Sequence, residues 1–214
     1  MRNQFDEQLG QLNQQMIQMG DLCETAISLA VQALQKESKH LIEEVHTADG
    51  EIDRMEREIE AFCMRLLLHQ QPIARDLRQI SSALKMISDM ERIGDQASDI
   101  AEIAECISGQ GTEGDALIRE MAREAVKMVS DSVDSYVHGD LELARAVIQY
   151  DDVVDSWFDR IRQELIGEIA ADNTVGEYCM DLLMIAKYLE RIGDHAVNIA
   201  EWVEYSVTGE HRKY

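Results

Sequence analysis

Hydrophobic residues recur along the first part of the chain at steps of three and four, the spacing of helices that pack lengthwise against each other. In the first segment these positions are Phe5, Leu9, Leu12, Met16, Met19, Cys23, Ala26, Ala30 and Ala33. The second segment runs from Leu41 to Leu66. After the turn signal Gln71-Pro72, the third follows with Ile73, Leu77, Ile80, Leu84 and Ile87. The pattern predicts three helices of roughly 25 to 35 residues, joined by short connections into an antiparallel bundle.

A cluster of turn residues interrupts this pattern near the middle of the chain, at Gly109, Gly111, Thr112 and Gly114. Beyond it the helical spacing begins again and predicts helices over about 113–138, from about 140 through 161, and from about 174 onward. We therefore expect two domains, 1–109 and 113–214, each a three-helix bundle.

The two halves are also similar in sequence. Residues 91–102, ERIGDQASDIAE, recur at 190–201 as ERIGDHAVNIAE, and nine of the twelve positions are identical. The pair Asp49 and Asp53 has a counterpart in Asp151 and Asp155, 102 positions later. A unit of about 100 residues is long enough to bury a core of its own. The predicted fold class is all-α, with two tandem antiparallel three-helix bundles related by internal duplication.

Composition and charge narrow the possible functions. The 214 residues are 45% apolar and 29% charged, a globular balance, and 20 Lys and Arg against 42 Asp and Glu leave a net charge of −22. Such a surface repels nucleic acid and anionic lipid, so we expect no nucleic-acid partner and only indirect, peripheral membrane contact. The start lacks an apolar signal region, which favours the cytoplasm. The four Cys residues form no CxxC pair and are expected to be reduced and mostly buried.

Acidic residues occur in four segments of the form acid-x-x-x-Asp, a spacing that places both carboxylates on one face of a helix. These pairs are Asp49 and Asp53, Glu91 and Asp95, Asp151 and Asp155, and Glu190 and Asp194. Turns at 70–71 and at 172–173 would set the pairs of each half opposite one another at the same height. Each bundle is therefore expected to gather four carboxylates from two helices, with Asp99 or Asn198 as a further oxygen ligand one turn on.

Two interpretations of these clusters stay open. Glu91 falls on the buried seam of its helix and needs a cation, an arginine or a proton, because an unpaired buried charge is expensive. Clustered carboxylates suit hard cations such as Mg²⁺, Mn²⁺, Ca²⁺ or iron. The alternative is a surface network in which Arg54, Arg57, Arg92 and Arg191 pair with the acids. His46 and His195 lie beside the motifs and are expected to be surface or packing residues.

Two glycines interrupt the helices that carry the second and fourth acidic pairs. Gly94 and Gly193 each weaken a helix by about 1 kcal/mol relative to Ala. Close approach of another backbone is the first explanation for them, and room for the acidic cluster is the second.

The doubled ERIGDxAxxIAE segments and the paired acidic motifs resemble the PhoU family, accessory proteins of bacterial phosphate uptake and signalling. The resemblance covers nearly the whole chain. It implies a cytoplasmic regulator without catalysis of its own that couples the phosphate ABC transporter ATPase to a sensor histidine kinase. It also implies repression of the starvation response in phosphate excess, and multinuclear iron or other metals such as Zn, Mn or Mg on the acidic motifs. A homodimer is expected. The motifs at Asp49 and Asp151 begin with Asp where the family has Glu, which shortens the reach toward a metal.

Three functions compete on this basis. The first is the regulator and adaptor, favoured by the duplication and by the lack of any nucleophile-base constellation. The second is a di-metal carboxylate enzyme, although such bundles usually carry a pair of Glu-x-x-His segments that this chain does not have. The third is a scaffold whose acids only keep it in solution.

Overall fold

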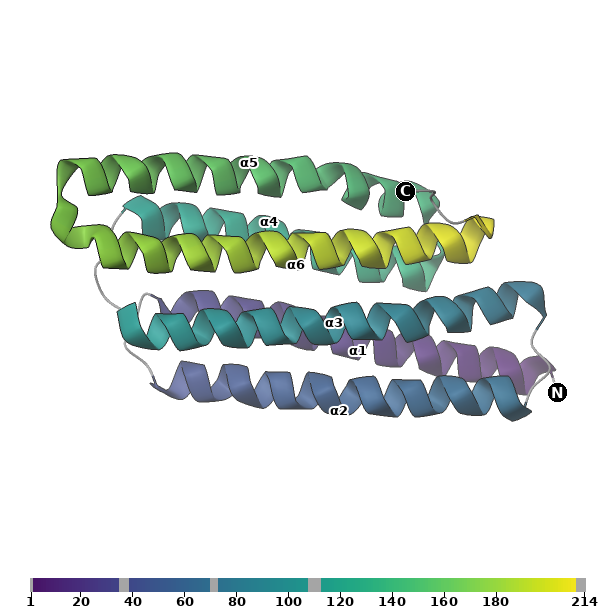
Figure 1. Cartoon of the computed structure of the whole chain (residues 1–214). Helices are drawn as coiled ribbons and strands as arrows, with labels where there is room; N and C mark the ends of the chain where they lie inside the picture. Colours follow the sequence, from purple (N-terminus) through teal and green to yellow (C-terminus); the bar gives the residue numbers. More distant parts are fainter. Residues whose placement is uncertain (1, 35–38, 70–72, 108–112, 211–214) are drawn as a thin grey trace.

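A computed structural model describes residues 2–34, 39–69, 73–107 and 113–210, and the regular structure in these ranges is entirely helical (Figure 1). The helices are α1 (Arg2–Ala33), α2 (Lys39–His69), α3 (Ala74–Ile107), α4 (Glu113–His138), α5 (Leu141–Ala171) and α6 (Gly176–Thr208), with a single 3₁₀ turn at Asn173–Val175. The predicted helices are confirmed. The predicted turn at Gln71-Pro72 and most of the break at 109–112 lie outside the described residues. Gly114, predicted to belong to that break, is instead buried in the first turn of α4.

The second predicted turn, at Asp172-Asn173, is confirmed and has a clear physical cause. The carboxylate of Asp172 accepts hydrogen bonds from the backbone N–H of Thr174 at 2.9 Å and from its hydroxyl at 2.7 Å. This local bonding stops α5 and lets the chain reverse into α6. The reversal sets the height at which residues of α5 face residues of α6.

The six helices form two antiparallel bundles, α1–α3 and α4–α6, stacked against each other (Figure 1). In the view of Figure 1, α5, α6, α3 and α2 form a front layer in that order from top to bottom, and α1 and α4 lie behind. Helices α3 and α6 pack together and run antiparallel, as do α1 and α4. The Ser82 hydroxyl on α3 donates to the Trp202 carbonyl on α6 at 2.9 Å. The pairs α3–α6 and α1–α4 therefore join the two bundles.

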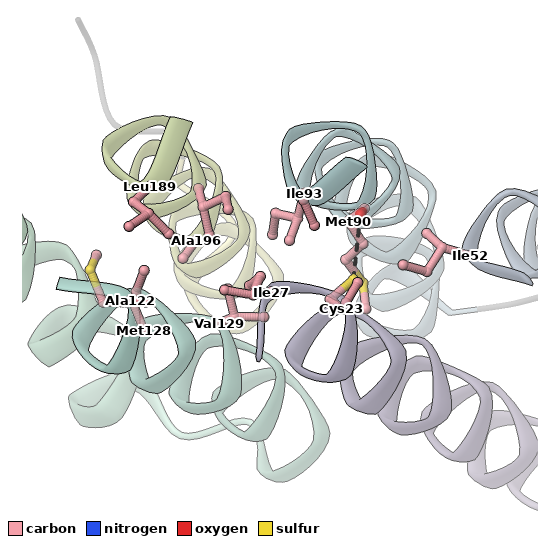
Figure 2. Close-up of a cluster of buried hydrophobic side chains, with 14 of the residues drawn as sticks. Cys23, Ile27, Ile52, Met90, Ile93, Ala122, Met128, Val129, Leu189 and Ala196 are labelled. Atoms are coloured by element: carbon pink, nitrogen blue, oxygen red, sulfur yellow. Dashed lines mark hydrogen bonds between the residues drawn. The ribbon is translucent and has the colours of Figure 1, made fainter. Parts of the chain in front are cut away.

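The hydrophobic core is continuous across both bundles. The side chains labelled in Figure 2 come from α1, α2, α3, α4 and α6 and gather in its interior, where the thiol of Cys23 on α1 donates to the carbonyl of Met90 on α3. Ala97 and Ala101 on α3 and Ala196 on α6 are fully buried. The buried residues of the two halves form one hydrophobic cluster. The domain limits 1–109 and 113–214 stay a prediction.

Two details of the predicted core differ from the structure. Ile73 and Leu77, assigned to the seam of the third helix, are 50% and 47% exposed. Both lie at the tip of the α2–α3 pair, where α2 ends at His69 and fewer helices remain to cover them. Of the four cysteines, all free, Cys23, Cys63 and Cys179 are buried as expected, and Cys106 is exposed.

Candidate functional site

The acidic motifs of α2 and α3 face each other at the same height, as the register predicted. Below them the Ser88 hydroxyl on α3 donates to Glu56 Oε1 on α2 at 3.3 Å, and above them Ser98 Oγ lies 3.5 Å from His46 Nδ1. Between these contacts, Asp49 Oδ1 on α2 lies 2.7 Å from the position that a Cβ atom on Gly94 of α3 would take. The carboxylate of Asp49 therefore lies directly over the glycine of the α3 motif.

The second bundle repeats this arrangement between α5 and α6, in a looser form. Asp151 Oδ1 on α5 lies 3.5 Å from the Cβ position of Gly193 on α6, and Val154 and Met128 are the other neighbours of that position. The predicted facing of the motifs is confirmed here too. The first explanation for the glycines, close approach of a backbone, is wrong. The atoms nearest to both are side-chain atoms, among them a carboxylate oxygen of the opposite motif in each bundle.

In the first cluster, the carboxyl groups of Asp49 and Glu91 hold their protons more tightly than in water. Burial is the largest cause that raises the pKa of Asp49, followed by the charges of Asp95 and Asp53. Burial also raises the pKa of Glu91, and the charge of Asp95 adds to the effect. Asp49 Oδ1 is in addition a buried oxygen without a hydrogen-bond partner among the described residues. The cluster therefore contains uncompensated negative charge.

The second cluster is the more strongly perturbed of the two. Burial raises the pKa of Asp151 to about 6, with further contributions from the charges of Asp155, Asp194 and Glu190. Burial likewise raises the pKa of Asp155 and of Asp194, and for both the charge of Glu190 is the next cause. Four carboxylates on adjacent helices thus act on one another electrostatically, as the spacing predicted.

Basic side chains neutralise part of each cluster. Arg92 lies 3.5 Å from Glu91 and 3.1 Å from Asp95, and Arg57 lies 3.7 Å from Asp53. Lys187 pairs with Glu190 in the second cluster. The ion-pair interpretation therefore accounts for the rim of each cluster, where exposed pairs contribute little stability.

The other two arginines of the ion-pair interpretation act on acids outside the four motifs. Arg54 pairs with Glu58, outside the motifs, and Arg191 acts on Asp99 of the other bundle. In the described part of the chain, no Lys or Arg forms an ion pair with Asp49 or Asp151. The ion-pair interpretation therefore leaves these two carboxylates unexplained.

Asp99 and Asn198, expected as additional oxygen ligands, turn toward the neighbouring bundle instead. The Asn198 side-chain amide on α6 donates to Asp89 Oδ1 on α3 at 3.0 Å, and His195 Nδ1 lies 2.9 Å from the same oxygen. Asp99 on α3 shares a hydrogen bond with Tyr188 on α6. Both residues thus belong to the contact between the two bundles.

The repeat held a signal for this contact that the periodicity did not reveal. At the offset of 99 residues, Asp89 corresponds to Tyr188 and Asp99 to Asn198. The bonds Asp89–Asn198 and Tyr188–Asp99 are therefore the same contact seen from the two halves. His195, expected as a surface or packing residue, is mostly buried in this contact, and His46 remains exposed.

The clusters offer the oxygen donors that a hard cation prefers, but their described side chains are not arranged as the ligands of one ion. Their oxygens match Mg²⁺, Mn²⁺ or iron, and Oδ1 of Asp49 has no hydrogen-bond partner among the described residues. Within the described ranges, no three His, Cys, Asp or Glu side chains stand close enough to hold one ion. Binding would require the rim carboxylates to leave Arg92 and Lys187 and to turn inward.

No described helix carries an apolar stretch long enough to span a bilayer.

The fold and its two clusters define a class of protein, a duplicated helical bundle with a carboxylate cluster on each repeat. The family model named PhoU domain matches this chain twice, at residues 16–104 and 118–203. The chain belongs to the PhoU family.

Curated relatives and solved structures agree with this assignment. Phosphate-specific transport system accessory protein PhoU homologues from Clostridium acetobutylicum and Pseudomonas aeruginosa are 36% and 37% identical to this chain. The alignments cover 97% and 96% of this chain, and 96% and 86% of the relatives. The crystal structure of PhoU from Pseudomonas aeruginosa matches 96% of this chain and all of its own, with a TM-score of 0.88 at 36% identity. The phosphate transport system regulatory protein PhoU from Streptococcus pneumoniae matches 98% of this chain and all of its own, with the same TM-score at 27% identity.

Proposed function

We propose that this protein is a non-enzymatic regulator that couples the phosphate ABC transporter to a sensor histidine kinase and represses the starvation response when phosphate is abundant. The observation that carries the proposal is the similarity over nearly the full chain to proteins named phosphate-specific transport system accessory protein. The acidic surface, at a net charge of −22, further favours work in the cytoplasm through basic protein partners, with the membrane reached only through them. We also propose that it acts as a homodimer.

Gene deletion with a reporter tests this function. Removing the gene is expected to switch on phosphate-starvation promoters in phosphate-rich medium, and a plasmid copy is expected to restore repression. Pull-down of the transporter ATPase and the kinase by the full chain, with light scattering for the dimer, tests the partners. Unchanged promoter activity after deletion would contradict the regulatory role.

We further propose that the two clusters bind metal ions, multinuclear iron or Zn, Mn or Mg. The residues that would hold them are Asp49, Asp53, Glu91 and Asp95 in the first bundle and Asp151, Asp155, Glu190 and Asp194 in the second. An ion there would supply the positive charge that Asp49 and Asp151 lack and would hold the two helices of each cluster together. In a regulator, such an ordering effect would present a defined face to a partner.

Calorimetric titration of metal-free protein with Mn²⁺, Zn²⁺ and ferrous iron tests the metal proposal. The double variant Glu91→Gln and Glu190→Gln is expected to weaken binding at least about tenfold, because it removes one charged ligand from each cluster. The matched control is Glu58→Gln, an exposed acid of α2 outside the motif that pairs with Arg54. Equal affinity of the double variant and the control would overturn the proposal and leave the ion-pair network as the role of these acids.

The alternative function is a di-metal carboxylate enzyme, for which the facing of two carboxylate pairs on adjacent helices is the supporting observation. Oxygen consumption and phosphoester hydrolysis by metal-loaded protein test it. Turnover that rises in proportion to bound metal, and disappears in the double variant, would favour the enzyme over the regulator.

A further inference from the structure

A cavity of about 440 Å³ opens at the end of the molecule opposite the α5–α6 turn, between the first turns of α3 and the last turns of α4 and α6. Its polar wall consists of Arg75, Gln79, His138 and Ser206. Its volume lies in the range of pockets that enclose small molecules, about 300 to 1,000 Å³. The acidic clusters lie elsewhere, along the middle of α2–α3 and α5–α6.

The backbone around this cavity is already satisfied by the protein itself. The Arg78 Nε donates to the Ser206 carbonyl at 3.2 Å, and the Asn13 amide donates to the Val137 carbonyl at 3.4 Å. The N–H of Gly139, at a φ of 63°, caps α4 by donating to the Tyr136 carbonyl at 3.2 Å. The ends of α4 and α6 therefore do not require a further cation.

Arg75 is consequently left without a protein partner in the described chain, although acids outnumber bases by two to one in the sequence. Its guanidinium keeps its donors available on the cavity wall. The neighbouring His138 uses Nδ1 toward the Asp134 carbonyl at 2.9 Å, which leaves Nε2 without a partner among the described residues. A guanidinium, an imidazole nitrogen and the Ser206 hydroxyl thus line the same cavity.

The rest of the lining is aliphatic and aromatic. Val137, Val203 and Val207 line it together with Tyr136, whose hydroxyl is already bonded to the Gln79 carbonyl at 3.2 Å. Val203 is buried, and Val207 is 41% exposed. A bound molecule would therefore meet cationic and polar groups as well as apolar carbon. An inorganic anion fills only a small part of this volume and does not use the apolar wall.

We propose that this cavity binds a small organic anion, a phosphate ester or carboxylate attached to a compact apolar body. Arg75 forms a bidentate pair with the oxyanion, and the Ser206 hydroxyl donates to a remaining oxygen atom. His138, whose Nδ1–H is used by the Asp134 carbonyl, donates through Nε2–H in its imidazolium form, and the three valines cover the body of the ligand. The site would give the protein a small-molecule input separate from the acidic clusters. The proposal does not depend on the regulatory function, and either can fail without the other.

Titration of the full-length protein with four probes, followed by NMR of the valine methyl groups and by calorimetry, tests the site. Phenyl phosphate and benzoate carry both features of the proposed ligand, inorganic phosphate carries only the anion, and phenol carries only the body. Phenyl phosphate is expected to shift the Val137, Val203 and Val207 methyl signals and to bind at least about tenfold more tightly than inorganic phosphate or phenol. Benzoate is expected to shift the same signals.

Arg75→Gln is expected to weaken phenyl phosphate binding at least about tenfold while leaving the circular dichroism spectrum and melting temperature unchanged, because Arg75 is exposed and pairs with no other described residue. The matched control Arg162→Gln, an exposed arginine of α5 paired with Asp159, is expected to leave binding unchanged. His138→Gln is a second variant and should weaken binding by a smaller factor. No shift of the valine signals at about 10 mM phenyl phosphate, equal binding of phenol, or undiminished binding by Arg75→Gln would each overturn the proposal.

Discussion

The carboxylate oxygen Oδ1 of Asp49 lies 2.7 Å from the point where a side chain on Gly94 would begin, although the two residues belong to different helices. The corresponding distance in the second bundle, from Asp151 Oδ1 to Gly193, is 3.5 Å. A side chain at the first position would therefore have to displace the carboxylate, which fills the space beside Gly94. At the second position, an added Cβ atom would make only an ordinary van der Waals contact with Asp151.

This difference predicts opposite effects for the same substitution in the two repeats. Gly193→Ala adds a methyl group without a clash and removes a helix-weakening glycine, so it is expected to stabilise the protein by up to about 1 kcal/mol. Gly94→Ala must displace the carboxylate of Asp49 and press against Ile52, 3.1 Å away. We expect it to be less stable than Gly193→Ala by at least about 1 kcal/mol. Urea unfolding measures both, and equal free energies of unfolding would contradict the prediction.

The raised pKa of Asp151 predicts that acidification stabilises the second bundle. An acid whose pKa is higher in the folded chain binds more protons when folded, so stability falls as the pH rises between the two pKa values. For Asp151 this interval runs from 3.8 to about 6. The destabilisation caused by the charge of Asp151 is absent below this interval and fully present above it. Asp151→Asn removes the charge and is therefore expected to stabilise the protein at about pH 7.5 by about 0.5 to 1 kcal/mol, a figure reduced for solvent screening.

The pH profile distinguishes this effect from a general change in packing. Near pH 4, where Asp151 is protonated in the wild type, Asp151→Asn should leave the free energy of unfolding almost unchanged. Glu164→Gln, an exposed acid on the same helix, is the matched control and should be nearly neutral at both pH values. A stabilisation by Asp151→Asn that is equal at both pH values would count against the electrostatic explanation.

The hydrophobic pattern predicted the six helices and the height at which the motifs meet, because both depend on spacing along the chain. It did not predict that the bundles share one core, since periodicity shows that a helix face is buried without showing which helix covers it. Asp99 and Asn198 were placed with the clusters on the same spacing argument. Their side chains instead point toward the other bundle, where Asp99 hydrogen-bonds with Tyr188 and Asn198 donates to Asp89. The glycines likewise required the coordinates, because only these place the carboxylate of Asp49 above Gly94.

The contact between the bundles offers a third test. Asn198→Ala removes one of two donors to the half-buried carboxylate of Asp89 and is expected to cost about 1 kcal/mol of stability. Asn198→Asp places a second carboxylate beside Asp89 and is expected to cost more at neutral pH than at about pH 3, where ordinary aspartate side chains are mostly protonated. Thermal unfolding at the two pH values measures both variants. Equal losses for Asn198→Asp at both would contradict the assigned donor.

Lys187 provides the last test, because its ammonium is the cation that moderates the second cluster. It pairs with Glu190 and lowers the pKa of both Asp155 and Asp194, opposing the effect of burial. Replacing it by Gln should therefore raise the pKa of these two carboxyl groups further, which carboxyl NMR titration measures directly. With these pKa values raised, the variant binds more protons when folded. Its free energy of unfolding should therefore fall more steeply with rising pH than that of the wild type. Arg123→Gln, which removes an exposed cation paired with Glu120 on α4, is the control and should not change the titration of Asp155 or Asp194. If Lys187→Gln titrates like the wild type at both aspartates, the second cluster is balanced by something other than this lysine.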